Sequence, residues 1–100
     1  MFGFIKKLMG GSSVDVNALI ASGAKVIDVR TPGEFSSGHV KGAVNIPLDQ
    51  ISSKLKSLKK DETYVLCCRS GMRSGNATRI MKSAGFSNVY NGGSWMNLKK

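Results

Sequence analysis

The chain has 100 residues, which is enough for one domain and too few for two. Its 41% hydrophobic and 21% charged residues are those of an ordinary soluble globular protein, and no run approaches the ~20 apolar residues of a membrane span. Fifteen Lys and Arg against six Asp and Glu give a formal charge of +9. Because these basic residues are scattered with few aromatic neighbours, we expect no nucleic-acid partner. A solvated basic face or attraction of small anions would account for the charge.

The first residues differ in composition from the rest. We expect residues 1–12 to form an apolar and basic tail, joined by the Gly-Gly-Ser-Ser stretch to a domain over 13–100. Lys6 and Lys7 interrupt the apolar residues early, which argues against a secretory signal. Membrane contact of this tail and loose packing on the domain remain open alternatives.

The pattern of the next half of the chain predicts short elements. Residues 13–23 read as a helix capped by Ser13, and the compact run at 24–29 reads as a buried strand. Residues 30–39 are rich in turn formers, and 42–47 read as a second short strand.

The second half continues the alternation. We predict a helix over 48–60, a buried strand over 62–67, a helix over 74–85 and a last strand over 86–91, with a tail from residue 92. Alternating helices and strands with short connections predict an α/β fold, a largely parallel sheet with helices on both faces. In such folds the functional site lies at the carboxyl ends of the strands.

The two cysteines, Cys67 and Cys68, stand side by side at such a strand end. Adjacent cysteines rarely form a disulfide, because the geometry of the bond requires a larger separation of their Cα atoms. With one histidine and no further cysteine pair, no metal site is expected. Two free thiols indicate a reducing compartment, so we expect a cytoplasmic protein, and at this size a monomer.

The stretch that follows the cysteines, Cys-Arg-Ser-Gly-Met-Arg-Ser, is suited to binding an anion. Loop amides and the amino end of the next helix would favour a thiolate, and Arg69 and Arg73 add positive charge. Gly71 allows the loop to curl, while Ser70 and Ser74 can donate hydrogen bonds. His39 lies far away in sequence, so we expect it to be a hydrogen-bonding strut and the thiolate to be activated without a general base.

Three segments resemble the single-domain rhodaneses, over roughly residues 14–95. The first is "VIDVRTPGEFSSGHVKGAVNIP", the second is the active-site loop "CRSGMRS", and the third is "GFSNVYNGGSWMN". The resemblance implies a rhodanese-like fold with a central, mostly parallel sheet of about five short strands. It also implies a thiosulfate sulfurtransferase, in which a cysteine persulfide carries a sulfane sulfur from thiosulfate or a similar donor to cyanide or a thiol, and no cofactor. A thioredoxin-like dithiol is a candidate acceptor.

The resemblance also assigns roles to residues. Cys68 would be the nucleophile, and Arg73 would help to bind the anionic donor, with Arg69 steering it. Asp28 and Arg30 would brace the active-site loop. The main-chain amides expected to hold the persulfide are those of Arg69, Ser70, Gly71, Met72 and Arg73, with Ser74 in support. Four more residues match the first segment and are expected to be structural: Glu34, His39, Gly42 and Asn45.

Counting from each cysteine gives a different loop. From Cys68 to Arg73 the loop has the six-residue size of sulfurtransferases, which leaves Cys67 to complete the strand. Counted from Cys67, the loop has the larger size found in related phosphatases and arsenate reductases. A phosphatase or arsenate reductase using Cys67 is therefore an alternative, and a non-catalytic sulfur-carrier or interaction module is another.

Overall fold

A single parallel sheet organises the protein, and the computed structural model describes residues 14–98. Within these residues the sheet has four strands in the order β3-β2-β4-β5, one fewer than the five or so expected. The strands are β2 (Lys25–Asp28), β3 (Val44–Asn45), β4 (Tyr64–Cys68) and β5 (Val89–Ser94). The tail over 1–12 and the predicted cap Ser13 lie outside the described residues.

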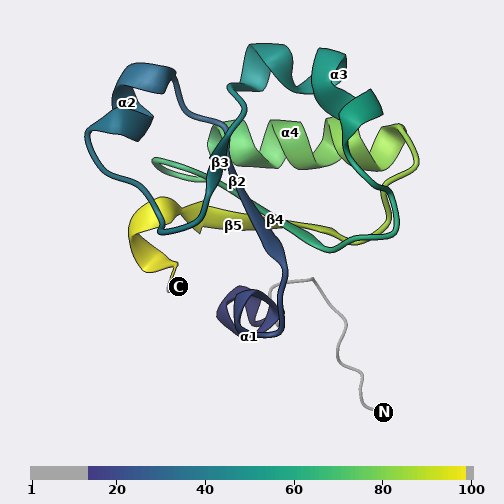
Figure 1. The fold of residues 1–100 in the computed structure, drawn as a ribbon, viewed down its shortest axis with the longest axis horizontal. Coiled ribbons are helices and arrows are strands. Elements are labelled where there is room, and N and C mark those ends of the chain that lie inside the picture. Colours follow the sequence, from purple (N-terminus) through teal and green to yellow (C-terminus); the bar gives the residue numbers. More distant parts are fainter. Residues whose placement is uncertain (1–13, 99–100) are drawn as a thin grey trace.

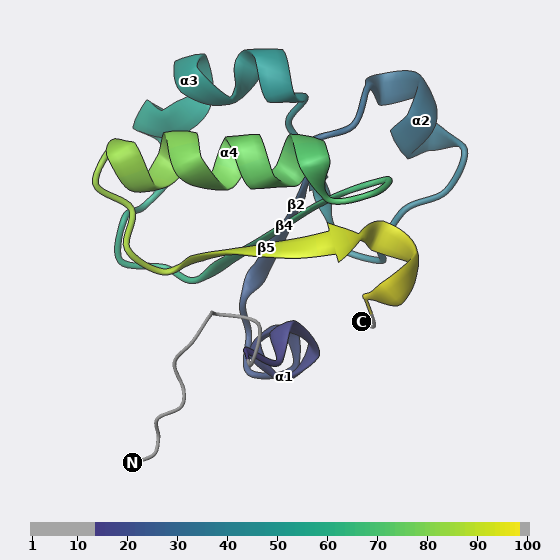
Figure 2. The ribbon, with the colours of Figure 1, turned by 180° about the vertical axis from the view of Figure 1, so that it is seen from behind.

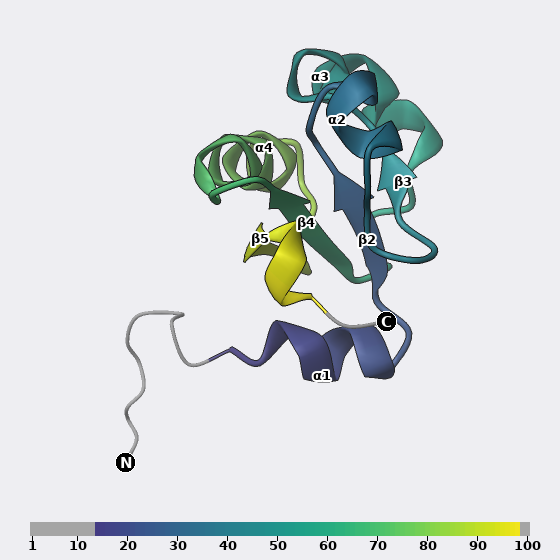
Figure 3. The same ribbon diagram turned by 90° about the vertical axis from the view of Figure 1, so that its left-hand side faces the viewer.

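Helices cover both faces of this sheet, as predicted (Figure 1). Figure 3 shows α3 and α4 on one side and α1 on the other. The α-helices are α1 (Val16–Ala21), α2 (Pro32–Ser36), α3 (Ile51–Lys54) and α4 (Met72–Ser83). The described residues also include three short 3₁₀ segments: η2 (Leu48–Gln50), η3 (Leu55–Ser57) and η4 (Trp95–Asn97). No helix in the described residues is both long and apolar enough to cross a membrane.

The ends of α1 and α4 follow from local chemistry. The Asp15 side chain caps α1 by accepting a hydrogen bond from the Ala18 N–H. Helix α4 begins after Gly71, whose φ of 103° lies in the left-handed region that glycine adopts without strain. Gly85, with a φ of 101°, follows the last turn of α4, where the sequence predicted the helix to stop.

Two segments differ from the sequence prediction. The turn-rich stretch after β2 contains α2, because Thr31 and Glu34 form a capping box around its first turn and Pro32 fits the first helical position. The single helix predicted over 48–60 is divided into η2, α3 and η3. These three pieces are short, and they still bury Ile51 completely against the sheet.

Strand β4 is buried along its whole length and separates two apolar clusters. Tyr64, Leu66 and Cys68 face the cluster under α3 and α4, whereas Val65 and Cys67 face the cluster under α1. This alternation is the ordinary pleat of a strand that is covered on both faces. The two adjacent thiols therefore belong to different cores.

The last strand is longer than predicted and contains an irregularity. β5 continues through Gly92 and Gly93 to Ser94, where the sequence predicted the beginning of a tail. Leu66 pairs with Asn91 but Cys67 pairs with Gly93, so one extra residue is inserted opposite β4. Such a bulge bends the strand and redirects its side chains, and bulges are common beside active sites. This bulge lies next to the loop that joins β4 to α4.

Gly92 is the residue at which a side chain would be tolerated least. A Cβ atom there would lie 2.7 Å from Val65 Cγ1 and 3.1 Å from the Leu66 carbonyl oxygen. We expect Gly92→Ala to lower the free energy of unfolding by about 1–3 kcal/mol, because the buried strand β4 must shift to make room. Gly33→Ala is the matched control, since no atom lies within 4 Å of the added Cβ. Chemical denaturation measures both, and equal stabilities would contradict a tightly packed bulge.

Candidate active site

The two cysteines occupy different environments. Both are buried, with 0% of their surface exposed, but Cys67 lies among the apolar side chains under α1. Burial and, to a smaller extent, the negative charge of Asp28 raise the pKa of Cys67 to about 12. Cys67 is thus a neutral core thiol, as the sequence predicted, and it lies on the side of β4 away from α4.

The sulfur of Cys68 lies under the loop and accepts hydrogen bonds from it. The Gly71 N–H donates to Sγ at 2.9 Å, and the Ser74 N–H does so at 3.4 Å. The Ser74 hydroxyl oxygen also lies 3.4 Å from Sγ. Burial opposes ionisation, but hydrogen bonds from the Ser74 hydroxyl and from the amides of Ser74, Gly71 and Ser70 outweigh it. The pKa of Cys68 is therefore lower than that of an ordinary thiol.

Arg73 does not stand free at the mouth of the loop. Its guanidinium forms two parallel hydrogen bonds with the Glu34 carboxylate, at 2.7 Å and 3.0 Å. This pair joins α4 to α2 and holds the pKa of Glu34 at about 2. The sequence assigned Arg73 to the donor anion and gave Glu34 only a structural role. In the structure, Glu34 already takes up both outer nitrogens of Arg73.

Asp28 and Arg30 form a second, buried pair at the end of β2. The Arg30 guanidinium lies 2.7 Å from the Asp28 carboxylate and donates to the Gly38 carbonyl at 2.6 Å. It also lies over the ring of Trp95, 4.6 Å from the ring centre. Through these contacts Arg30 joins β2 to the segment after α2 and to η4. Asn45 supports the same corner through the carbonyls of Asp28 and Arg30.

A small cavity lies beside the loop. Figure 2 shows the end of the sheet at which α2 and the loop between β4 and α4 lie. The volume of the cavity is about 210 Å³. Its lining residues are Arg30, Glu34, Ser37, Arg69, Trp95 and Met96. Arg69 is exposed, and among the described residues no ion pair to its guanidinium is found. Met96, which lines the cavity together with Arg69, is 65% exposed, and Met72 at the start of α4 is 79% exposed.

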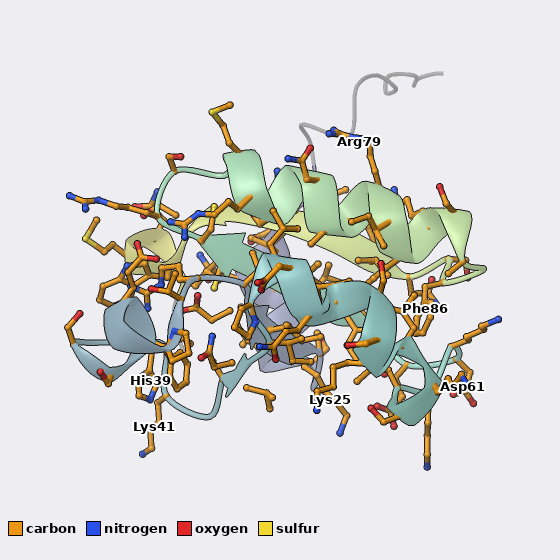
Figure 4. All side chains as sticks on the ribbon, turned by 90° about the horizontal axis from the view of Figure 1, so that it is seen from above. Lys25, His39, Lys41, Asp61, Arg79 and Phe86 are labelled. Carbon is orange, nitrogen blue, oxygen red and sulfur yellow. The ribbon has the colours of Figure 1, made fainter. Side chains whose placement is uncertain are left out.

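The remaining predicted residues lie away from the sulfur. His39 Nδ1 lies 2.7 Å from the Phe35 carbonyl oxygen and its ring stacks on that of Phe35, which fits the predicted strut (Figure 4). Gly42 has a φ of 82°, which fits a structural turn position. Within residues 14–98, no three His, Cys, Asp or Glu side chains gather closely enough to hold a metal ion.

Asn91 is a residue of the site that sequence reasoning missed. Its side chain reaches the loop from β5 and contacts both Gly71 and Ser74, the two residues whose groups touch the Cys68 sulfur. The two glycines after Asn91 are the signal that could have found it, because they allow the bulge that places this side chain beside the loop. The lack of a side chain at Gly75 leaves room for Asn91, since a Cβ at this position would lie 3.2 Å from Asn91 Nδ2.

The geometry distinguishes the two ways of counting the loop. The amides of Gly71 and Ser74 point at Cys68, whereas Cys67 packs on the opposite face of the sheet. A phosphatase or arsenate reductase using Cys67 finds no support in this arrangement, because the raised pKa of Cys67 and its distance from the loop donors both disfavour a thiolate there.

Comparison with known proteins places this site in a family. The family model described as "Rhodanese-like domain" matches residues 12–98. YqhL of Bacillus subtilis, a protein without a known function, is 40% identical over 68% of this chain and 54% of its own length. The thiosulfate sulfurtransferase PspE of Escherichia coli is 36% identical over 67% of this chain and 66% of its own length. The chain thus spans about half to two thirds of these relatives.

Solved structures share the fold. A rhodanese from E. coli, determined with anions, superposes with a TM-score of 0.70 at 32% identity and covers 75% of this chain and 91% of its own. The human single-domain sulfurtransferase TSTD1 superposes with a TM-score of 0.73 at 28% identity, covering 85% and 92% of the two chains. The family model, the sulfurtransferase relatives and the shared fold lead to one conclusion: this chain belongs to the rhodanese-like family.

Proposed function

We propose that the protein is a sulfurtransferase that carries a sulfane sulfur as a persulfide on Cys68, with thiosulfate or a similar anion as donor. The observation that carries this proposal is the set of donors around the Cys68 sulfur. The Gly71 N–H, the Ser74 N–H and the Ser74 hydroxyl all lie within 3.4 Å of it. Hydrogen bonds from these partners favour the thiolate form of a buried sulfur, which supports a nucleophile that needs no general base.

The reaction divides into two displacements. In the first, the Cys68 thiolate attacks the outer sulfur of thiosulfate, an S–S bond to Sγ forms, and sulfite leaves with the electron pair of the broken bond. In the second, an acceptor attacks the outer sulfur of the persulfide, and Cys68 leaves as a thiolate. The amides that hold the thiolate also suit the negative outer sulfur of the persulfide, since each displacement moves negative charge within the same ring of donors.

Arg69 is the side chain best placed to attract the donor. It lines the cavity beside the loop, and Glu34 and Asp28 neutralise Arg73 and Arg30 respectively. An anion that enters the cavity therefore meets one unbalanced positive charge. Cys68 has no exposed surface, so the donor reaches the sulfur only after a side chain at the mouth of the loop moves aside.

The acceptor is the second substrate of the proposed reaction. Cyanide is a convenient acceptor for measurement, and a small or protein-borne thiol, such as a thioredoxin-like dithiol, fits the same chemistry because its thiolate attacks the outer sulfur in the same way. The non-catalytic alternative, a sulfur-carrier or interaction module, would hold the persulfide without passing sulfur to either class of acceptor.

Separate replacement of the two cysteines tests the assignment of the nucleophile. We expect Cys68→Ser to reduce the formation of thiocyanate from thiosulfate and cyanide by roughly a thousandfold or more, since no persulfide can form on it. Cys67→Ala is the matched control, and we expect it to keep the activity while losing about 1–2 kcal/mol of stability from the core under α1. Mass spectrometry after incubation with thiosulfate should show one added sulfur atom on the Cys67→Ala protein and none on the Cys68→Ser protein. Loss of activity in Cys67→Ala alone would overturn the assignment.

The role of Arg69 can be separated from the general positive charge. We expect Arg69→Ala to raise KM for thiosulfate about three- to tenfold at low salt, and the difference from the unmodified protein should shrink as salt screens the charge. Arg79→Ala is the control, because Arg79 is exposed and projects from the outer side of α4 away from the loop (Figure 4). An equal rise in KM for the two variants would show that Arg69 contributes only to the overall charge.

The hydrogen bonds to Cys68 also predict how its reactivity depends on pH. Because its pKa is lowered, the thiolate should persist below the pH at which an ordinary cysteine becomes protonated. The rate of alkylation by iodoacetamide should therefore rise with pH and reach half of its maximum below the value for a free cysteine in the unfolded protein. Cys67→Ala leaves Cys68 as the single thiol for this measurement. A midpoint above that of the unfolded protein would mean that burial, rather than hydrogen bonding, dominates at Cys68.

A further inference from the structure

The side chain of Asn91 touches both residues that hold the sulfur. Its Nδ2 donates to the Gly71 carbonyl at 3.0 Å, and its Oδ1 accepts from the Ser74 hydroxyl at 2.6 Å. Gly71 and Ser74 supply three of the groups that contact the Cys68 sulfur. The side-chain amide of Asn91 on β5 is thus connected to the sulfur through two residues.

The orientation of this amide is determined by its neighbours. The Gly71 carbonyl can only accept a hydrogen bond, and the Gly93 N–H, 3.0 Å from Oδ1, can only donate one. Both constraints place Nδ2 toward Gly71 and Oδ1 toward the Ser74 hydroxyl. Asn91 therefore presents an acceptor to Ser74, and Ser74 must be the donor in that contact.

A serine hydroxyl has one hydrogen, and here two acceptors lie within its reach. Asn91 Oδ1 is at 2.6 Å and the Cys68 sulfur is at 3.4 Å from the same oxygen. When Ser74 donates to Asn91, its lone pair faces the sulfur, which suits a thiol S–H and disfavours a thiolate. When Ser74 donates to the sulfur, the contact with Asn91 is lost. Only rotation of the hydroxyl separates the two arrangements.

We propose that Asn91 is a positioning residue that holds the hydroxyl hydrogen of Ser74 while Cys68 is a thiol or a persulfide, and yields it to the sulfur when Cys68 becomes a thiolate. This inference rests on the proposed function for the persulfide form. In a persulfide the negative charge resides on the outer sulfur, so Sγ is a weak acceptor and Ser74 returns to Asn91. Asn91 thereby opposes the thiolate and favours the two forms that precede and follow it.

The charged and titratable groups near Cys68 are the same whether or not Asn91 is present. Arg73 with Glu34 lies on the side of α2, and Asp28 with Arg30 lies at the end of β2, near Cys67. None of these side chains contacts Asn91 in the described structure. Their effects on Cys68 therefore cancel when variants of Asn91 and Ser74 are compared.

A double-mutant cycle isolates the shared hydrogen. The pKa of Cys68 is measured from the pH dependence of iodoacetamide alkylation in four proteins on the Cys67→Ala background: the parent, Asn91→Ala, Ser74→Ala and the double variant. Loosening of the loop through Gly71 raises the pKa whether or not Ser74 is kept, whereas release of the hydroxyl lowers it only where Ser74 is present. Asn91→Ala changes the pKa of Cys68 by one amount when Ser74 is present and by another when residue 74 is alanine. We expect the first change to be more negative than the second by about 0.5 to 1 pH unit.

The outcomes are distinct from those that test the proposed function, because alkylation needs neither donor nor acceptor. The coupling is the difference between the two pKa changes. A coupling of zero or of the opposite sign overturns the inference even if the protein turns over thiosulfate. The expected coupling supports the inference even if the protein does not turn over thiosulfate. Asn91→Leu, which has a similar size and accepts no hydrogen bond, repeats the cycle if Asn91→Ala does not fold. Asn88→Ala is the control on the same segment: this exposed side chain is outside the loop contacts, and its removal should leave the pKa unchanged.

Discussion

The pleat of β4 is the constraint on which the site depends. Successive residues of a strand point to opposite faces, so the adjacent cysteines are directed into two separate cores although one peptide bond joins them. Cys67 is fixed under α1, where burial keeps it neutral, and Cys68 is fixed under the amino end of α4. A shift of the β4 register by one residue would exchange these environments. The pairing of β4 with β2 and β5 therefore determines which thiol lies under the loop.

The electrostatics of the site rely on dipoles more than on full charges. Arg73 and Arg30 are each bound to a carboxylate, one beside the loop and one at the end of β2. What remains at the sulfur is a set of main-chain N–H groups, with one hydroxyl in addition. In the proposed reaction, fixed main-chain dipoles need no rearrangement when charge moves between the inner and the outer sulfur, whereas a mobile side-chain cation would have to follow it. The Arg73–Glu34 pair holds α2 beside the loop, and Arg30, paired with Asp28, packs on Trp95 of η4. The two ion pairs thus position α2 and η4 next to the hydrogen-bond donors of the loop.

The sequence was sufficient to predict the features with a local cause. The alternation of helices and strands, the assignment of Cys67 to the core and a curled loop at Gly71 follow from short patterns, and the structure agrees with each of them. Contacts between distant segments were not predictable in the same way. The partner of Arg73 is 39 positions away, and it depends on the capping box that turns a Pro-Gly stretch into α2. The bulge in β5 likewise exists only through its pairing with β4, so the role of Asn91 could not be read from its own neighbours.

The support of the sulfur therefore comes in part from β5, an outer strand of the sheet within the described residues. Among the described strands, β5 lies at one end of the sheet, and outer strands open locally more easily than central ones. Asn91 connects this edge to the loop, and Trp95, just beyond the same strand, covers Arg30. Opening of β5 would release both contacts at once. The surroundings of Cys68 would then be held only by the central strand β4 and by α4. Local stability of the edge strand and ionisation of the sulfur are thus linked, since the arrangement of donors around Cys68 requires β5 to be in place.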